Sequence, residues 1–290
     1  MQGVLHAIVE PGFFSSPQVQ LAAALGGVVA VVAAGIGVFT VIRGQSFAGE
    51  ALGDIGAAGG SSAYLVNIAP LWGFVAISVA ASAVMELIGI QRVRGRDLAT
   101  GIVLGFGFGL AALFLYLGTN YESTTGATIT ILFGSIFAIS SSILPLVVGL
   151  GAITVAIVVA LYRPLLLVSV SPELAAARGI PVRLVGAAYL FAMSIAVALS
   201  AVTIGAILST AVLVGPAAAA LRLTSRPHRA ILTAAALGLG CTWLGLVLSW
   251  DSFYWPPVQH GWPVSFFVVT LVLVAYLVSG PLARRRRTHA

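Results

Sequence analysis

The sequence contains no lysine and very little charge of either sign. Only 8% of its 290 residues are charged, whereas soluble domains carry about 25%. Hydrophobic residues make up 60% of the chain, and the mean hydropathy is +1.10. This composition is typical of a polytopic membrane protein. All 14 basic residues are arginines in short gaps between apolar segments, so the net charge of +6 indicates membrane topology and not a nucleic-acid-binding face.

The absence of lysine also excludes one route of ATP hydrolysis. The phosphate-binding loop G-x-x-x-x-G-K-[ST] requires its lysine, so any energy from ATP must come from a partner. Cysteine is nearly absent as well, and the single Cys241 excludes an intramolecular disulfide and a cysteine-based metal site. No H-E-x-x-H motif is present. We therefore expect a protein that is not an enzyme and holds no permanent cofactor.

Nine segments are apolar enough and long enough to cross a bilayer, which takes about 20 residues. They cover residues 19–42, 49–67, 71–90, 99–118, 143–162, 184–202, 203–221, 230–250 and 263–280. We predict an all-α polytopic membrane protein, a single domain over residues 1–290 with about nine transmembrane helices, eight or ten being the alternatives. Residues 124–141 are rich in Thr, Gly and Ser, which predicts a short or re-entrant helix.

Arginine positions predict the orientation of the chain. Arginine-rich gaps between spans face the cytoplasm, and residues 1–42 contain no Arg or Lys. The N-terminus is therefore predicted outside and the C-terminus inside, as nine spans require. Residues 281–290, which include Arg284–Arg287, are predicted to form a basic cytoplasmic tail.

Two carboxylates interrupt the apolar pattern in RGQSFAGEALGD (43–54). Glu50 and Asp54 lie four residues apart, so on a helix they share one face, about 6 Å from each other. A charged residue at the centre of a membrane helix costs about 2.5–3.5 kcal/mol, and such residues mark ion paths. We interpret the pair as a cation site. The alternative is that both lie in the first turns of a helix capped by Ser46, where the helix dipole favours them.

Residues 169–183 form a polar segment between two spans. Ser171 is a predicted N-cap, Pro172 the first helical residue and Glu173 part of the first turn, while Gly179 ends the helix. A short capped helix at the membrane surface is suited to docking a soluble partner. An ordinary surface loop is the alternative.

Gly101, Gly105 and Gly109 recur at four-residue spacing, which predicts close contact with another helix. Packing within one bundle is one interpretation of this stripe, and a homodimer seam is the other.

Four segments together resemble the permease subunits of bacterial metal-ion ABC importers, which carry zinc, manganese or iron. They are RGQSFAGEALGD (43–54), LFGSIFAIS (132–140), SPELAAARGIPV (171–182) and TIGAILSTAVLVGPAAAALRLT (203–224). In the family these correspond to an Arg-x-x-Ser-x-x-Gly-Asp-Ala-x-x-His segment, a Leu-Phe-Gly stretch, an acidic–Ala–Gly–Ile coupling segment, and a hydrophobic stretch ending in Pro–Ala–Ala–x–Ala. The resemblance runs in order over roughly residues 19–280.

The resemblance implies a homodimeric permease that imports a divalent metal ion across the bacterial plasma membrane. Two cytoplasmic ATP-binding subunits would drive it, and an extracytoplasmic metal-binding protein would deliver the ion. Coupling to the ATPase would use Pro172, Glu173, Ala176, Gly179 and Ile180. An ATP-independent channel or secondary transporter for a cation or small solute is the alternative. Apart from membrane lipid and these subunits, no partner is implied, and nucleic acid is excluded.

The resemblance places Glu50 at the family's acidic position and Asp54 at its histidine position. Two carboxylates suit manganese or other hard cations, whereas a pair with an imidazole suits zinc. Two side chains cannot complete a coordination shell, so carbonyls, water or the second subunit must contribute. His260, in the outer loop WPPVQHGWP, is a further candidate for receiving the metal or the binding protein, and an ordinary loop histidine is the alternative.

Overall fold

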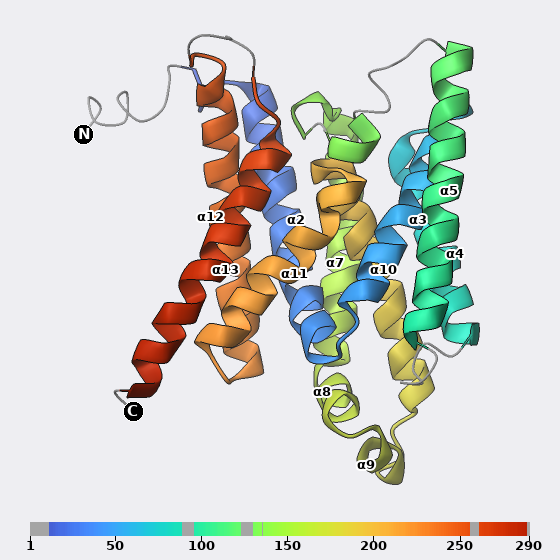
Figure 1. Cartoon of the computed structure of the whole chain (residues 1–290), viewed down its shortest axis with the longest axis vertical. Coiled ribbons are helices and arrows are strands. Elements are labelled where there is room, and N and C mark those ends of the chain that lie inside the picture. Colours follow the sequence, from blue (N-terminus) through green and yellow to red (C-terminus); the bar gives the residue numbers. More distant parts are fainter. Residues whose placement is uncertain (1–11, 89–95, 123–129, 135, 256–260, 289–290) are drawn as a thin grey trace.

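The computed structural model describes residues 12–88, 96–122, 130–134, 136–255 and 261–288 (Figure 1). Within these ranges every regular element is a helix, which confirms the predicted all-α class. The elements are α2 (Pro17–Ile42), α3 (Ser46–Leu65), α4 (Pro70–Ile88), α5 (Arg96–Glu122), η1 (Ile136–Ala138), η2 (Ser141–Ile143), α7 (Leu144–Ala160), α8 (Tyr162–Val170), α9 (Pro172–Ala177), α10 (Val182–Ile204), α11 (Ala206–Leu223), α12 (Pro227–Ser252) and α13 (Val264–Thr288).

Each of the nine predicted spans falls on one of these helices. Among the described residues, eight helices are long and apolar enough to cross a membrane, and they are α2, α4, α5, α7, α10, α11, α12 and α13. The ninth, α3, has 20 residues but falls outside this set, because it carries Glu50, Asp54 and several glycines. A helix that is too polar for lipid must be covered by other helices.

The most buried helices lie at the centre of the bundle. Of the most apolar stretch, 78% is buried in α10 and 67% in α2, against 17% in α5 and 22% in α13. Helices α2 and α10 therefore form the core, and α5 and α13 present apolar side chains at the periphery of the bundle.

The two ends of the bundle differ in structure. Helix α9 protrudes at the end where α13 also finishes, and α2 begins at the opposite end (Figure 1). We call the first the α9 end. That it faces the cytoplasm is a prediction from the arginine positions.

The helices differ from the predicted ones in three respects. Helix α13 continues through Pro281 to Thr288, so most of the predicted tail 281–290 is helical. An additional helix, α8, follows the span that ends near residue 162. Ser46 is the first residue of α3 and not its cap; Gln45 holds the N-cap position without a side-chain cap hydrogen bond. Ser46 therefore does not cap the carboxylate helix, which was one part of the alternative interpretation of Glu50 and Asp54.

The described part of 124–141 consists of short helical turns rather than a span. Gly134 and Gly205 both have positive φ, of 74° and 102°. A Cβ on Gly134 would collide with the backbone at Ile204, and one on Gly205 with the backbone at Leu132. Only glycine fits both the conformation and the approach. The segment therefore covers the tight turn between α10 and α11.

The stripe of Gly101, Gly105 and Gly109 packs against no residue that the structure describes. A Cβ on any of the three would meet nothing within 4 Å in the described structure, so the prediction of packing within one bundle is wrong for this stripe. Gly107 makes the contact instead, because a Cβ there would lie 2.8 Å from the backbone nitrogen of Ile55 in α3.

Candidate functional site

Helix α3 carries both predicted ion-path carboxylates and is enclosed by α4, α5, α10 and α11. Its glycines permit this close packing. A Cβ on Gly53 would lie 3.0 Å from Ser209 Oγ in α11, and a Cβ on Gly59 would collide with the backbone of Gly73 in α4. Because these contacts are to backbone or to buried side chains, α3 cannot rotate without moving its neighbours. The direction of its polar side chains is therefore fixed by packing.

Asp54 is the buried member of the pair. Its side chain is 3% exposed, and its Oδ2 has no hydrogen-bond partner within the described part of the chain. Glu50, one helical turn earlier, is half-buried. An ionised carboxylate without a donor is expensive to bury, and a second carboxylate adds repulsion. A cation bound between them would relieve both penalties.

A hydroxyl oxygen that could serve as a metal ligand lies close to α3. Ser209 of α11 is fully buried, and its hydroxyl donates to Ala206 O at 2.8 Å, which leaves lone pairs on Oγ. In the described ranges no group of three or more His, Cys, Asp and Glu side chains could hold a metal ion. A cation at Glu50 and Asp54 therefore needs additional oxygen ligands, from water, from the backbone or from a second subunit.

One interhelical hydrogen bond fixes α3 close to the carboxylates. Ser78 of α4 is fully buried, and its hydroxyl donates to the carbonyl oxygen of Leu52 at 3.0 Å. This bond joins α4 to α3 two residues before Asp54. Nothing in the sequence distinguishes Ser78 from the many serines that bond within their own helix.

A polar cluster fixes the beginning of α3 against α10. The guanidinium of Arg43 lies 5.1 Å from the ring centroid of Tyr189, and Arg43 Nε donates to Gln45 Oε1 at 3.0 Å. Tyr189 is buried, with its hydroxyl 2.6 Å from Thr40 Oγ1 and donating to Ile36 O at 3.2 Å. The α2–α3 turn, which leads into the carboxylate helix, is thus held by α10. Sequence reasoning did not find Tyr189, because its partners lie about 150 residues away.

The predicted coupling helix is present as α9. The hydroxyl of Ser171 accepts a hydrogen bond from Leu174 N at 3.3 Å, with Pro172 and Glu173 in the first turn, as predicted. The helix ends before Gly179, whose φ is +77°. Of the five predicted coupling residues, Ile180 is half-buried. The other four are exposed, and they are Pro172, Glu173, Ala176 and Gly179. The inward face of α9 carries the fully buried Ala175.

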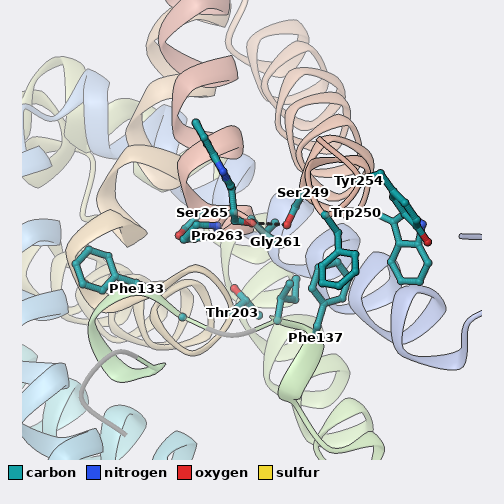
Figure 2. Close-up of a pocket in the computed structure, with 14 residues that line it drawn as sticks. Phe133, Phe137, Thr203, Ser249, Trp250, Tyr254, Gly261, Pro263 and Ser265 are labelled. Carbon is teal, nitrogen blue, oxygen red and sulfur yellow. Dashed lines mark hydrogen bonds between the residues drawn. The ribbon is translucent and has the colours of Figure 1, made fainter. Parts of the chain in front are cut away.

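The end of the bundle opposite α9 contains a cavity of about 500 Å³ between residues 133–134 and 136–137, the end of α12 and the start of α13 (Figure 2). Thr203, Ser249 and Ser265 contribute buried hydroxyls to a lining otherwise rich in aromatic rings. Ser249 Oγ donates to Trp262 O at 2.7 Å. The residues described around this cavity include no carboxylate, so it does not suit a divalent cation. His260 lies outside the described residues.

Comparison with known proteins gives one consistent result. Residues 15–279 match the ABC 3 transport family. The chain is 30% identical over 264 residues to ScaB, a manganese import system permease protein of Streptococcus gordonii, covering 90% of this chain and 89% of that one. It is 29% identical over 236 residues to MntC, a manganese transport system membrane protein of Halalkalibacterium halodurans, covering 81% and 79%.

The fold is similar to that of PsaBC from Streptococcus pneumoniae in complex with Fab, with a TM-score of 0.81, 23% identity and full coverage of both chains. The resemblance to metal-ion ABC permeases is confirmed. The protein is a multi-pass permease subunit of the plasma membrane and not an enzyme. By the match over residues 15–279 and the identity to ScaB, the chain belongs to the ABC 3 transport family.

Proposed function

We propose that this permease imports a divalent metal ion, with manganese as its cargo, along a path that includes Glu50 and Asp54. The observation that carries the proposal is the buried Asp54 carboxylate, whose Oδ2 has no donor among the described residues while Glu50 lies one turn away. Such a pair is stabilised when a cation neutralises it. When both carboxylates are ionised they repel each other, and a bound cation removes this repulsion.

Manganese is favoured by the chemistry of the donors. Carboxylate and hydroxyl oxygens are hard ligands, which suit manganese better than they suit zinc. The imidazole that the family resemblance led us to expect is replaced by Asp54. The relatives ScaB and MntC are themselves manganese permeases. Zinc and iron are the competing cargoes.

ATP supplies the energy through a separate subunit. The chain has no lysine for a phosphate-binding loop, and α9 is a capped, exposed helix at the end of the molecule (Figure 1). In this proposal the ATP-binding subunit docks on α9, and an extracytoplasmic metal-binding protein docks on the opposite end of the bundle. A second copy of the permease completes the complex and contributes further ligands to the ion.

The test is metal uptake by proteoliposomes that contain the permease with its ATP-binding subunit. Glu50→Gln combined with Asp54→Asn should abolish uptake of radioactive Mn²⁺ while the complex still assembles, as judged by size-exclusion chromatography. Normal uptake by the double variant would exclude the proposed path. Zn²⁺ and Fe²⁺ as competitors rank the three metals. Uptake that proceeds without ATP would instead support a channel or secondary transporter.

A further inference from the structure

One corner of the α9 end is strongly basic and contains no acidic residue. The turn between α11 and α12 contributes Arg222, Arg226 and Arg229, and the end of α13 contributes Arg284–Arg287, which together are half of the 14 basic residues of the chain. The sequence has no Asp or Glu between Glu173 and Asp251, and none after Asp251. We call these seven arginines the basic corner. By contrast, Arg178, next to α9, follows Glu173 by five residues.

The two parts of the basic corner lie together because α11, α12 and α13 pack against each other. Arg222 joins them directly. Its guanidinium carbon lies 3.6 Å from the ring centroid of Tyr276 in α13, and Nη1 donates to Tyr276 O at 3.3 Å. Arg284 follows Gly280, which also lies close to Arg222, by one helical turn, or about 6 Å. The guanidinium of Arg222 is therefore held between α11 and α13.

The basic corner lies at the border of the apolar surface. On α13, Leu273, Leu277 and Leu282 are 55%, 59% and 47% exposed, and the arginines begin directly after this apolar stretch. In the α11–α12 turn, Arg222, Arg226, His228 and Arg229 are all exposed. An apolar band that ends in exposed cations matches the acyl chains and the phosphate layer of a bilayer.

The position of the basic corner argues against the ATP-binding subunit as its partner. In Figure 1 the α11–α12 turn and the end of α13 lie at the lower left, well apart from α9, which protrudes further at the bottom. Helix α13 is peripheral, with only 22% of its apolar stretch buried. The corner thus lies at the periphery of this chain and apart from α9.

From this charge, rigidity and placement, we infer that the basic corner binds the phosphate headgroup of an anionic phospholipid, with the acyl chains along α13. Arg226 and Arg229 contact the phosphate from the turn, and Arg222 holds α11 against α13 beneath it. Charge complementarity makes an anionic headgroup preferable to a neutral one. The sequence around these arginines contains no acidic residue that would neutralise them. A uniform positive-inside signal would not require half of the basic residues to gather at one corner formed by α11, α12 and α13.

The test uses the full permease complex in phosphatidylcholine nanodiscs with a minor fraction of phosphatidylglycerol, followed by native mass spectrometry of the released complex. The wild type should retain phosphatidylglycerol in preference to phosphatidylcholine. Arg226→Gln combined with Arg229→Gln should lower the retention roughly 30-fold, because each arginine beside an anionic headgroup contributes about 1 kcal/mol and 1.4 kcal/mol corresponds to tenfold. The matched control, Arg178→Gln with Arg183→Gln, removes the same charge from exposed positions next to α9.

Unchanged retention in the Arg226/Arg229 variant, or an equal fall in the control, would overturn the inference. Loss of the ATP-binding subunit from the Arg226/Arg229 variant would overturn it too, because the corner would then be a protein interface. Inorganic phosphate in millimolar excess separates the two sources of phosphate. It should not displace phosphatidylglycerol if the acyl chains contribute; full displacement would mean a site for soluble phosphate and would overturn the lipid assignment.

Discussion

Gly59 of α3 and Gly73 of α4 touch backbone to backbone, and each leaves no room for a side chain on the other. Small residues allow membrane helices to approach this closely and to gain dispersion energy along their length. The contact lies one and a half turns beyond Asp54 on the same helix. It sets the distance between α3 and α4, and with it the position of the carboxylates.

Gly59→Ala should therefore destabilise the permease, because the added methyl group collides with the backbone of Gly73, which cannot rotate away. Overpacking of this kind costs about 1–3 kcal/mol. The measurement is the thermal midpoint of the purified complex by fluorescence-detected size-exclusion chromatography. Gly105→Ala is the control, since a Cβ there meets nothing within 4 Å. Equal midpoints for the two variants would contradict the α3–α4 contact.

Gly107→Val should impair transport more than Gly105→Val, although the two substitutions have the same intrinsic effect on helix α5. A side chain on Gly107 displaces Ile55, the neighbour of Asp54, whereas one on Gly105 points away from the chain. We expect at least a tenfold loss of Mn²⁺ uptake for the first variant and near-normal uptake for the second. If Gly105→Val instead prevents dimer formation in cross-linking, the exposed stripe is a subunit seam, as the sequence left open.

Ser78→Ala should loosen α3 without removing any charge. The Leu52 carbonyl loses an interhelical hydrogen bond of about 1 kcal/mol, so the carboxylates are positioned less accurately. We expect the KM for Mn²⁺ to rise several-fold with little change in the amount of assembled complex. Ser62→Ala is the matched control, because Ser62 donates to Gly59 within its own helix. A similar change in both variants would show that Ser78 has no positioning role.

Ser171→Ala should weaken coupling by fraying α9. Loss of an N-cap side chain costs about 0.5–2 kcal/mol, and a helix of six residues has little other support. Metal-stimulated ATP hydrolysis should fall, and co-purification with the ATP-binding subunit should weaken. Ser171→Asp, which can still cap the helix, should restore both. Failure of the aspartate variant to do so would mean that the hydroxyl acts in another way.

The spans could be predicted from the sequence because hydropathy is a local property of each segment. Helix α9 could be predicted equally well, because Ser171 and Pro172 favour the start of a helix and Gly179 favours its end by their own chemistry. The contacts that these helices make with one another could not be predicted from the sequence. The spacing of the glycines in α5 defined a helix face, but only the packed structure shows that Gly107, and not the stripe beside it, meets Ile55.

The same limit applies to the candidate site. Glu50 and Asp54 are conspicuous because charge is rare in this chain, and their four-residue spacing within an apolar stretch identified them. The bonds that orient their helix, from Ser78 to Leu52 and from Tyr189 to Thr40, connect distant segments through residues that are common in membrane helices. No local pattern encodes such contacts. They follow from the arrangement of the whole bundle.

The polarity of α3 has a consequence for how the protein is made. Insertion of a helix into lipid depends on its own apolar surface, and α3, with two carboxylates and several glycines, has too little to remain there alone. It is enclosed by α4, α5, α10 and α11, all of which are synthesised after it. When only α2 and α3 have been synthesised, α3 therefore lacks the helices that enclose it in the folded permease.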